Sequence, residues 1–224
     1  MLSKSTRIFE ALIAARESGM KVIPVSGRGR IQVRELCRLF GFERGIGELG
    51  CLHAQGGDVH WEFGDFPLTN TSPVEFMHQE GLLDLVMSLG DLQEHAPWNE
   101  GRHATLLVRG HIDVAAAEAE LTEHGFGWCQ IIDNGLTRND TERVYHLIPR
   151  GAGKRFGVLR DRERNGIAKE DAVFVGDSRA DMNFADEVRE CWLVANGDSS
   201  LQWPNRTEAS NADGVAELIY RLIG

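Results

Sequence analysis

Two hydrophobic periods alternate along the chain, one typical of helices and one typical of short strands. Ile8, Leu12 and Ala15 recur at the spacing of one helix face, and Gly19 follows them as a stop signal. The unbroken apolar run Ala172–Val175 is typical of a strand that is buried on both faces of a parallel sheet. This alternation predicts an α/β fold. The elements predicted before residue 62 are helices over 5–18 and 30–40, and strands over 21–25 and 46–61 with a turn at 55–57.

The pattern changes near Glu62, where a loop rich in glycine, proline, serine and threonine begins. The strands and helices beyond it suggest a small inserted α+β layer rather than a continuation of the first sheet. The inserted elements are predicted as helices over 73–90 and 114–124, strands over 105–108, 127–132 and 144–149, and a turn at 133–135. The parallel rhythm then resumes with helices over 152–165, 179–188 and 212–223 and strands over 171–176 and 191–194. We therefore expect a Rossmann-like core from 1–62 and 147–224 and an inserted cap domain from 63–146.

Composition and charge exclude several classes of protein. The 224 residues are 42% apolar and 26% charged, which is ordinary for a soluble globular chain. The net charge of −10, without any basic run, argues against nucleic acid as a partner. No apolar run approaches the roughly 20 residues of a membrane span, and the first residues do not form a secretory signal. We therefore expect a cytoplasmic protein without a membrane or nucleic-acid partner, and its oligomeric state stays open.

The four cysteines, Cys37, Cys51, Cys129 and Cys191, are far apart in the sequence. They form no closely spaced pair of the kind that binds zinc, so buried free thiols are the expected state. The eight histidines likewise show no paired spacing typical of a metal site.

Two aspartates near the end of the chain are candidates for metal binding. Gly176 ends a predicted strand, so Asp177 lies at the carboxyl end of that strand, where open α/β sheets bind their ligands. Asp181 follows four residues later and can turn back toward the same point. Two converging carboxylates suit a hard divalent cation such as Mg²⁺. The alternative, from spacing alone, is that Asp177 and Ser178 cap a helix while Asp181 is solvated.

Two further stretches can bind an anion. Ser26 and Gly27 follow a short apolar run, and together they offer a hydroxyl and free backbone N–H groups, although an ordinary strand-to-helix turn is the simpler interpretation. Lys154 begins a predicted helix after a glycine pair. This second stretch is not a Walker A loop, because Ile148 replaces the first glycine and Arg155 replaces the final Ser or Thr. A cation in the first turn opposes the helix dipole, which suggests a use outside the helix.

Taken in order, these stretches resemble the second, third and fourth motifs of the haloacid-dehalogenase superfamily of phosphohydrolases. Ser26 matches the second motif, Lys154 the third and the segment Gly176–Asp181 the fourth. The long insertion between the second and third motifs resembles the C2-type α+β cap of the sugar-phosphate phosphatase branch, which includes Cof-type, sucrose-phosphate and mannosyl-3-phosphoglycerate phosphatases. The segments 47–50 and 145–154 add to the resemblance.

The resemblance implies an Mg²⁺-dependent hydrolase that acts on a small phosphorylated metabolite such as a sugar phosphate. It implies that Ser26, Gly27 and Arg28 bind the transferring phosphoryl group and that Lys154 neutralises its charge. Asp177 would bind Mg²⁺, and Asp181 would be a further ligand or a supporting catalytic residue. Positioning and charge neutralisation are also what phosphoryl transfer requires physically. Four polar or aromatic residues near the predicted cap strands are candidates for substrate selection: Trp98, Arg102, His103 and Arg109.

One feature of the superfamily is absent from these residues. The first motif, Asp-x-Asp, supplies the nucleophile and the acid/base carboxylate, yet the first aspartate here is Asp58, which comes after the second motif. One interpretation is a phosphatase whose recorded sequence lacks roughly its first 15 to 25 residues. The other is a catalytically inactive relative that binds a phosphorylated ligand or a partner protein. We favour the first interpretation, and expect no turnover from the recorded chain and an open slot between the strands 22–25 and 172–175.

Overall fold

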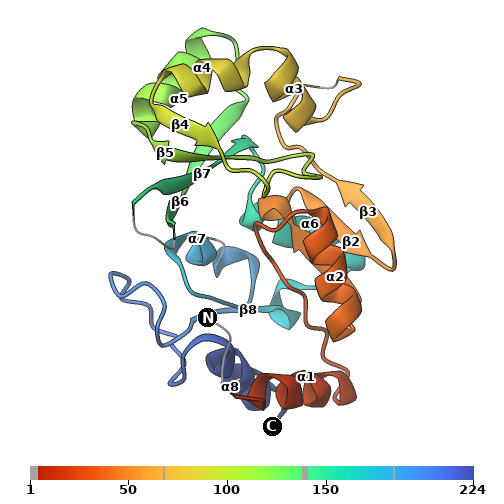
Figure 1. Cartoon of the computed structure of the whole chain (residues 1–224). Coiled ribbons are helices and arrows are strands. Elements are labelled where there is room, and N and C mark those ends of the chain that lie inside the picture. The colour runs from red at the N-terminus through yellow and green to blue at the C-terminus, as the bar shows by residue number, and fades with distance from the viewer. Residues whose placement is uncertain (1–4, 68, 138–140, 184) are drawn as a thin grey trace. The chain divides into compact units, whose positions relative to one another are not determined.

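The computed structural model describes residues 5–67, 69–137, 141–183 and 185–224 (Figure 1). The chain divides into two compact units. The terminal unit comprises Met1–Pro24, Gly41–Glu43 and Val158–Gly224, and the central unit comprises Val25–Phe40 and Arg44–Gly157. The central unit thus joins residues 25–40 to the predicted insertion. The predicted division into a core of 1–62 and 147–224 and a cap of 63–146 stays a prediction.

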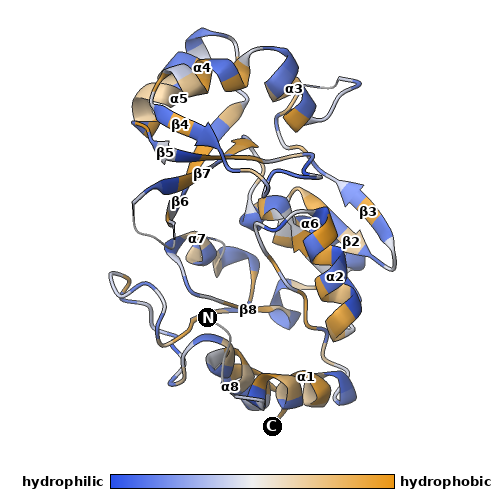
Figure 2. Ribbon diagram, in the orientation of Figure 1, coloured by the Kyte–Doolittle hydropathy of each residue, from blue (hydrophilic) through white to orange (hydrophobic). Residues whose placement is uncertain are grey.

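The terminal unit contains a helix pair and a small parallel sheet. Helices α1 (Arg7–Glu17) and α8 (Asn211–Ile223) pack through small apolar residues, which allow a close approach of the two helices. Apolar and polar residues alternate along both helices, as expected for amphipathic helices (Figure 2). Strand β8 (Val173–Gly176) pairs in parallel with β9 (Glu190–Leu193), and the short helix α7 (Arg179–Met182) follows β8. The buried residues of the helix pair are Ala11, Ala15, Ala216 and Ile219.

Strand β8 differs from the prediction in its burial. All of its residues are partly exposed, although their apolar sequence predicts burial on both faces. Within the described part of the terminal unit, β9 is the only strand that forms a ladder with β8. A strand that has a neighbour on one side only keeps more of its surface accessible. The ladder with residues 22–24 that would contradict the expected slot is thus not formed in this unit, whereas the width of the slot stays a prediction.

The central unit contains two antiparallel sheets. Helix α2 (Arg30–Phe40) packs against the smaller sheet, which has the order β1-β2-β3. The larger sheet has the order β4-β5-β7-β6, and helices α4 and α5 lie on one of its faces (Figure 1). The strands are β1 (Arg44–Gly47), β2 (Leu52–Gln55), β3 (Asp58–Trp61), β4 (Asp91–Glu94), β5 (Leu106–His111), β6 (Cys129–Leu136) and β7 (Arg143–Pro149). The helices are α3 (Pro73–Gln79), α4 (Leu82–Ser88), α5 (Val114–Glu123) and α6, which begins at Lys154 and ends at Asn165.

The larger sheet buries both of its faces within the central unit. Alternate residues of the strands, such as Leu106 and Val108 on β5, pack against the helices in one hydrophobic cluster. Residues that alternate with them face the other way, and Ile148 packs there against Leu49 and Cys51. A strand turns successive side chains to opposite faces, so both faces of β7 are buried, and His146 shares its face with Ile148.

Several predicted elements were wrong for local reasons. Residues 21–24 form no strand, and Val25 contributes only a parallel bridge to Ile46. The helix predicted over 73–90 breaks at Gly81, whose φ of 79° lies outside the helical range. Strand β4 was missed, and the predicted turn at 133–135 is an irregularity inside β6. The helix predicted over 179–188 ends at Met182, and Phe184 lies outside the described residues.

The cysteine prediction is confirmed. All four thiols are free, three of them are buried, and burial raises the pKa of the Cys129 thiol to about 12. Among the described residues, the model contains no helix long and apolar enough to cross a membrane.

A turn of left-handed residues joins β1 to β2. Glu48, Leu49 and Gly50 have φ values of 42°, 56° and 109°, although side chains other than glycine rarely adopt this region. A Cβ atom on Gly50 would overlap the carbonyl oxygen of Gly153, just before α6. The turn 47–50 therefore packs directly against the backbone that leads to Lys154.

We predict that Gly50→Ala lowers the free energy of unfolding by about 3 kcal/mol or more, because backbone strain and overlap with Gly153 add. Gly125→Ala is the matched control, since Gly125 also has a positive φ, of 84°, but would place its Cβ in open space. The control should cost only about 1–2 kcal/mol. Urea unfolding of both variants measures the difference, and equal losses would show that the close approach to Gly153 does not matter.

Candidate phosphate-binding and metal-binding residues

Residues 26–29 form a loop whose carbonyl oxygens are held by other parts of the central unit. The carbonyl oxygen of Ser26 accepts a hydrogen bond from Leu49 N at 3.1 Å, and that of Arg28 accepts one from Glu48 N at 2.9 Å. Between them, the carbonyl oxygen of Gly27 accepts a hydrogen bond from Arg102 Nη2 at 2.8 Å. Three successive carbonyl groups are therefore fixed in direction, two by the turn 47–50 and one by Arg102.

Fixing a carbonyl group also fixes the next amide, because C=O and N–H point in opposite directions across a trans peptide. The amides of Gly27, Arg28 and Gly29 are therefore turned away from the turn 47–50 and Arg102. Within the described residues, Gly27 N–H donates no hydrogen bond, whereas Arg28 N donates to Ser26 Oγ at 3.2 Å and Gly29 N donates to Gln32. Helix α2 begins directly afterwards, which adds the positive end of its dipole. The loop is a concave set of donors suited to an anion.

Gly27 is required by a close approach. A Cβ atom at this position would lie 3.3 Å from a methyl group of Leu49 and 3.4 Å from Cε1 of His146. His146 projects from β7 and is 2% exposed, and its Nδ1 atom has no hydrogen-bond partner within the described residues. Burial lowers the pKa of His146 to about 3, assisted by the charges of Arg102, Lys154 and His95. The imidazole behind the loop is therefore neutral at neutral pH.

A buried carboxylate links this loop to the segment before β5. Glu48 is fully buried, and its carboxylate accepts hydrogen bonds from the backbone N–H groups of His103, Ala104 and Thr105. Burial raises the pKa of Glu48, and these donors together with Arg102 oppose that shift. Sequence reasoning assigned no role to Glu48 or His146. The signal that could have identified Glu48 is a charged residue in a short glycine-flanked segment between two apolar strands.

Lys154 lies close to the same turn. It is the first residue of α6 and is partly exposed. Gly153 precedes it and Gly157 follows one turn later, and both pack on the backbone of Gly50. Ser26 and Lys154 are therefore both attached to the turn 47–50, from its two sides. This arrangement agrees with a shared anion site in the central unit, and the role of each residue stays a prediction.

The two aspartates belong to the terminal unit and differ in their surroundings. Asp177 is exposed and follows β8 directly. Asp181 is 3% exposed, and its Oδ2 accepts hydrogen bonds from Asp177 N, Ser178 N and Ser178 Oγ at 3.2, 3.2 and 2.8 Å. The alternative that Asp181 is solvated is therefore wrong. Its carboxylate shapes the backbone that carries Asp177, and a Cβ atom on Gly176 would overlap it.

A second loop of the terminal unit supports Asp177. The N–H of Asp198 donates to the carbonyl oxygen of Asp177 at 2.8 Å. The guanidinium of Arg206 donates to the carbonyl oxygens of Asp198 and Leu201 at 3.2 and 3.0 Å, so it fixes the loop from which Asp198 approaches. Sequence reasoning did not identify Arg206, because all of these acceptors are main-chain atoms that leave no mark in the sequence.

The donor types present suit Mg²⁺, but the set is small. Carboxylate oxygens are the ligands this ion prefers, and Asp177 presents one at the carboxyl end of a strand. Within the described residues no group of three or more histidine, cysteine, aspartate or glutamate side chains is placed to hold a metal ion. Asp177 would therefore hold Mg²⁺ with few protein ligands, while the assignment of Asp181 as a ligand stays a prediction. The convergence of Asp177 with Ser26 and Lys154 also stays a prediction, since they belong to different units.

Comparison with known proteins tests the fold. No protein-family model matches the chain. A haloacid dehalogenase-like hydrolase from Bacteroides thetaiotaomicron has a TM-score of 0.71 at 17% identity, covering 98% of this chain and 93% of that chain. The sucrose-phosphatase of Synechocystis has a TM-score of 0.66 at 16% identity, covering 98% and 92%. The chain has the haloacid dehalogenase-like fold.

The family resemblance seen in the sequence is thereby confirmed, as is the α/β fold class. At the level of sequence, phosphoglycolate phosphatase 1 from Saccharolobus solfataricus is 27% identical over 228 residues, which cover 98% of this chain and 89% of the relative. Relatives and structures that share the haloacid dehalogenase-like fold with this chain thus carry the names of phosphatases and hydrolases, which supports the predicted class of enzyme.

The depressed pKa of His146 predicts how stability depends on pH. The pKa is about 3 in the folded chain and about 6.5 in an unfolded one, so the unfolded state binds more protons between these values. Stability should therefore be complete above pH 6.5 and fall as the pH decreases toward 3. In urea unfolding between pH 7.5 and pH 5, the native chain should lose roughly 2 kcal/mol more than His146→Gln. Glu48 has the opposite sign but is common to both proteins, and parallel pH profiles would contradict the assignment.

The different surroundings of the two aspartates predict different effects on stability. Asp181→Ala removes an acceptor shared by three donors in a buried turn, so it should cost about 1–3 kcal/mol. Asp177→Ala changes an exposed side chain and should cost about 0.5 kcal/mol or less. Urea unfolding measures both values, and a larger loss for Asp177→Ala would contradict the supporting role of Asp181.

Proposed function

We propose that the protein is an Mg²⁺-dependent phosphomonoester hydrolase that acts on a small phosphorylated metabolite. The observation that carries the proposal is the 26–29 loop, whose three successive carbonyl groups are held so that the following amides turn outward. Such a set of amides at a helix N-terminus binds the oxygens of a phosphoryl group. The haloacid dehalogenase-like fold and the named phosphatases that resemble the chain support this assignment.

Each predicted site residue has a physical role in this proposal. Ser26 Oγ and the amides of Gly27 and Arg28 bind the phosphoryl oxygens. Lys154, at the start of α6, neutralises part of the phosphoryl charge, since its cation there cannot be meant for the dipole of its own helix. Asp177 would hold Mg²⁺, which supplies further charge neutralisation when it is bound. Asp181 keeps Asp177 in place through the backbone and so supports this site without reaching the substrate.

The covalent route used in this superfamily needs an aspartate nucleophile, and the proposal makes turnover depend on an Asp-x-Asp strand. None of the aspartates in these residues precedes Ser26, because the first is Asp58. This observation also favours a second candidate function, a protein that binds a phosphorylated ligand without hydrolysing it. The two candidates share the phosphate-binding residues and differ only in turnover.

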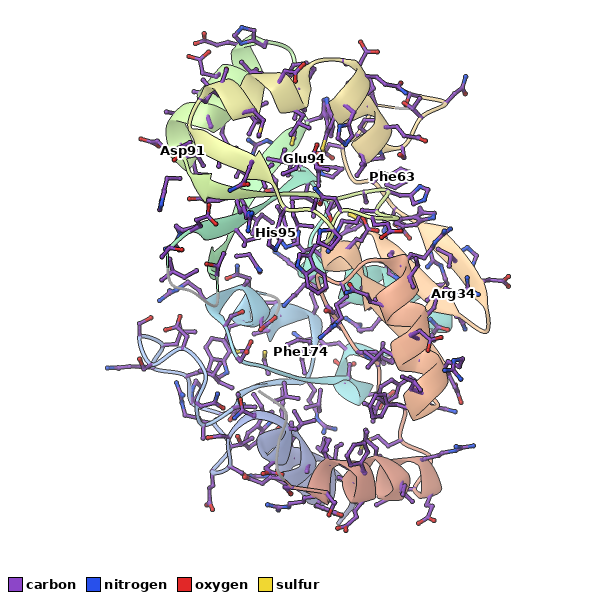
Figure 3. The ribbon with its side chains drawn as sticks, viewed as in Figure 1. Arg34, Phe63, Asp91, Glu94, His95 and Phe174 are labelled. Atoms are coloured by element: carbon purple, nitrogen blue, oxygen red, sulfur yellow. The ribbon has the colours of Figure 1, made fainter. Side chains whose placement is uncertain are left out.

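The substrate is proposed as a small phosphorylated metabolite such as a sugar phosphate. The similarity to a sucrose-phosphatase supports a sugar phosphate, and the similarity to a phosphoglycolate phosphatase supports a smaller substrate with a carboxylate. His95, which directly follows β4, and Arg109 on β5 are near enough for the charge of Arg109 to lower the pKa of His95 (Figure 3). Cationic side chains of this kind would favour the carboxylate-bearing substrate.

The test compares the 224-residue chain with the same chain joined to a designed N-terminal strand that ends in Asp-x-Asp. The chain alone should bind inorganic phosphate but show no hydrolysis of p-nitrophenyl phosphate. The extended chain should hydrolyse it in the presence of Mg²⁺, and Asp177→Asn or Lys154→Ala should reduce turnover at least about 100-fold. Parallel assays with 2-phosphoglycolate and sucrose phosphate then separate the substrate classes.

Three outcomes decide between the candidates. Phosphate binding without turnover in the extended chain would favour the ligand-binding protein. Turnover that is unaffected by Asp177→Asn and Lys154→Ala would place the chemistry elsewhere in the molecule. Absence of phosphate binding in both proteins would contradict both candidates.

A further inference from the structure

We propose that Arg102 is a positioning residue for the phosphate loop, holding the Gly27–Arg28 peptide so that the Arg28 amide faces the bound phosphoryl group. This inference rests on the proposed function and extends it to a residue outside the recognised motifs. Arg102 precedes β5 in the inserted segment, 75 residues after its acceptor Gly27. Its role is to act through the loop rather than to touch the substrate.

The contacts of Arg102 leave its guanidinium committed to the protein. Its Nε donates to the carbonyl oxygen of Trp98 at 2.7 Å and its Nη1 to Thr105 Oγ1 at 2.7 Å. The third donor, Nη2, reaches the carbonyl oxygen of Gly27 at 2.8 Å. The residue is only 8% exposed, so the earlier expectation that it selects the substrate directly does not agree with its position. Three acceptors on three sides fix the plane of the guanidinium, as its fork geometry allows.

Glu48 holds the other end of this arrangement. Thr105 Oγ1 accepts from Arg102 and donates to Glu48 Oε2 at 3.4 Å, while the Thr105 amide donates to the same oxygen at 3.0 Å. Glu48 also donates its own N–H to the carbonyl oxygen of Arg28. One residue thus binds the loop through its backbone and the Arg102 segment through its side chain. The loop and the inserted segment are therefore parts of one hydrogen-bonded network.

The charge of Arg102 also has an effect on the loop. Arginine stays protonated in proteins, and Glu48 stabilises this charge although burial opposes it. A cation that donates to a carbonyl oxygen polarises the whole peptide, so the amide on its far side becomes a stronger donor. The Gly27–Arg28 peptide has this arrangement, with the guanidinium at one end and the outward amide at the other. Arg102 should therefore raise the affinity of the loop for an anion without contacting the anion.

The inference predicts that Arg102→Gln weakens phosphate binding about tenfold or more, since a hydrogen bond that involves a charged group is lost. Arg102→Lys keeps the charge but has a single ammonium for three acceptors, so it should recover only part of the affinity. Thr105→Val is a milder variant that removes the link to Glu48 while it leaves Arg102 in place. Arg143→Gln is the matched control, because Arg143 is an exposed arginine of the same unit that pairs with Asp133 at the surface.

The experiment uses the full chain and two readouts. Titration with inorganic phosphate follows the amide resonances of Gly27, Arg28 and Gly29 by NMR and gives the affinity of each variant. Hydrogen exchange without phosphate follows the amides of Glu48 and Leu49, which donate to the loop carbonyls, with the β5–β7 ladder amides as the reference for global stability. A merely structural role would change exchange at all of these amides to the same extent.

The expected result is weaker phosphate binding and at least about tenfold faster exchange at Glu48 and Leu49 in Arg102→Gln, relative to the reference amides. Thr105→Val should show the same changes to a smaller extent, and Arg143→Gln should show neither. Unchanged affinity together with unchanged relative exchange in Arg102→Gln would overturn the inference. If the native chain does not respond to phosphate, the proposed function fails, and the exchange readout alone still decides whether Arg102 orders the loop.

Discussion

The burial of the Glu48 carboxylate is the constraint on which the central unit depends. A buried carboxylate is costly unless hydrogen bonds compensate it, and here consecutive backbone amides of residues 103–105 supply that compensation. To reach them, Glu48 adopts a left-handed backbone that is itself unfavourable for a residue with a side chain. The strain and the desolvation are tolerated only because the same residue orders the phosphate loop, the inserted segment and the turn that packs on α6.

The local parts of the candidate site could be predicted from the sequence. Ser26 and Gly27 before a helix, and Asp177 after an apolar run, are patterns whose physical meaning lies within a few residues. Helix α2 was predicted with its observed bounds for the same reason. The helix over 73–90 failed at Gly81, where one residue with a positive φ outweighs the helical spacing of its neighbours. In each case the outcome was decided by interactions between residues close in sequence.

The long-range parts could not be predicted in this way. Glu48 binds amides that are 55 to 57 residues away, and Arg102 binds a carbonyl 75 residues away. Backbone acceptors and donors have no signature in the sequence, so neither interaction is visible before the fold is known. The burial of β8 failed for a related reason, because exposure depends on which strands are its neighbours. The residue type alone could not distinguish Asp181, a buried acceptor, from Asp177, an exposed carboxylate.

The way in which Glu48 holds the inserted segment has a consequence for how this segment can diverge. Its carboxylate contacts main-chain amides at 103 and 104, and these exist whatever side chains stand there. Substitution at these two positions therefore leaves the contact intact, provided that the residue is not proline, which lacks the amide. An insertion or deletion between β4 and β5 would instead move the amides away from the carboxylate. The segment is tolerant of changes in identity and intolerant of changes in length.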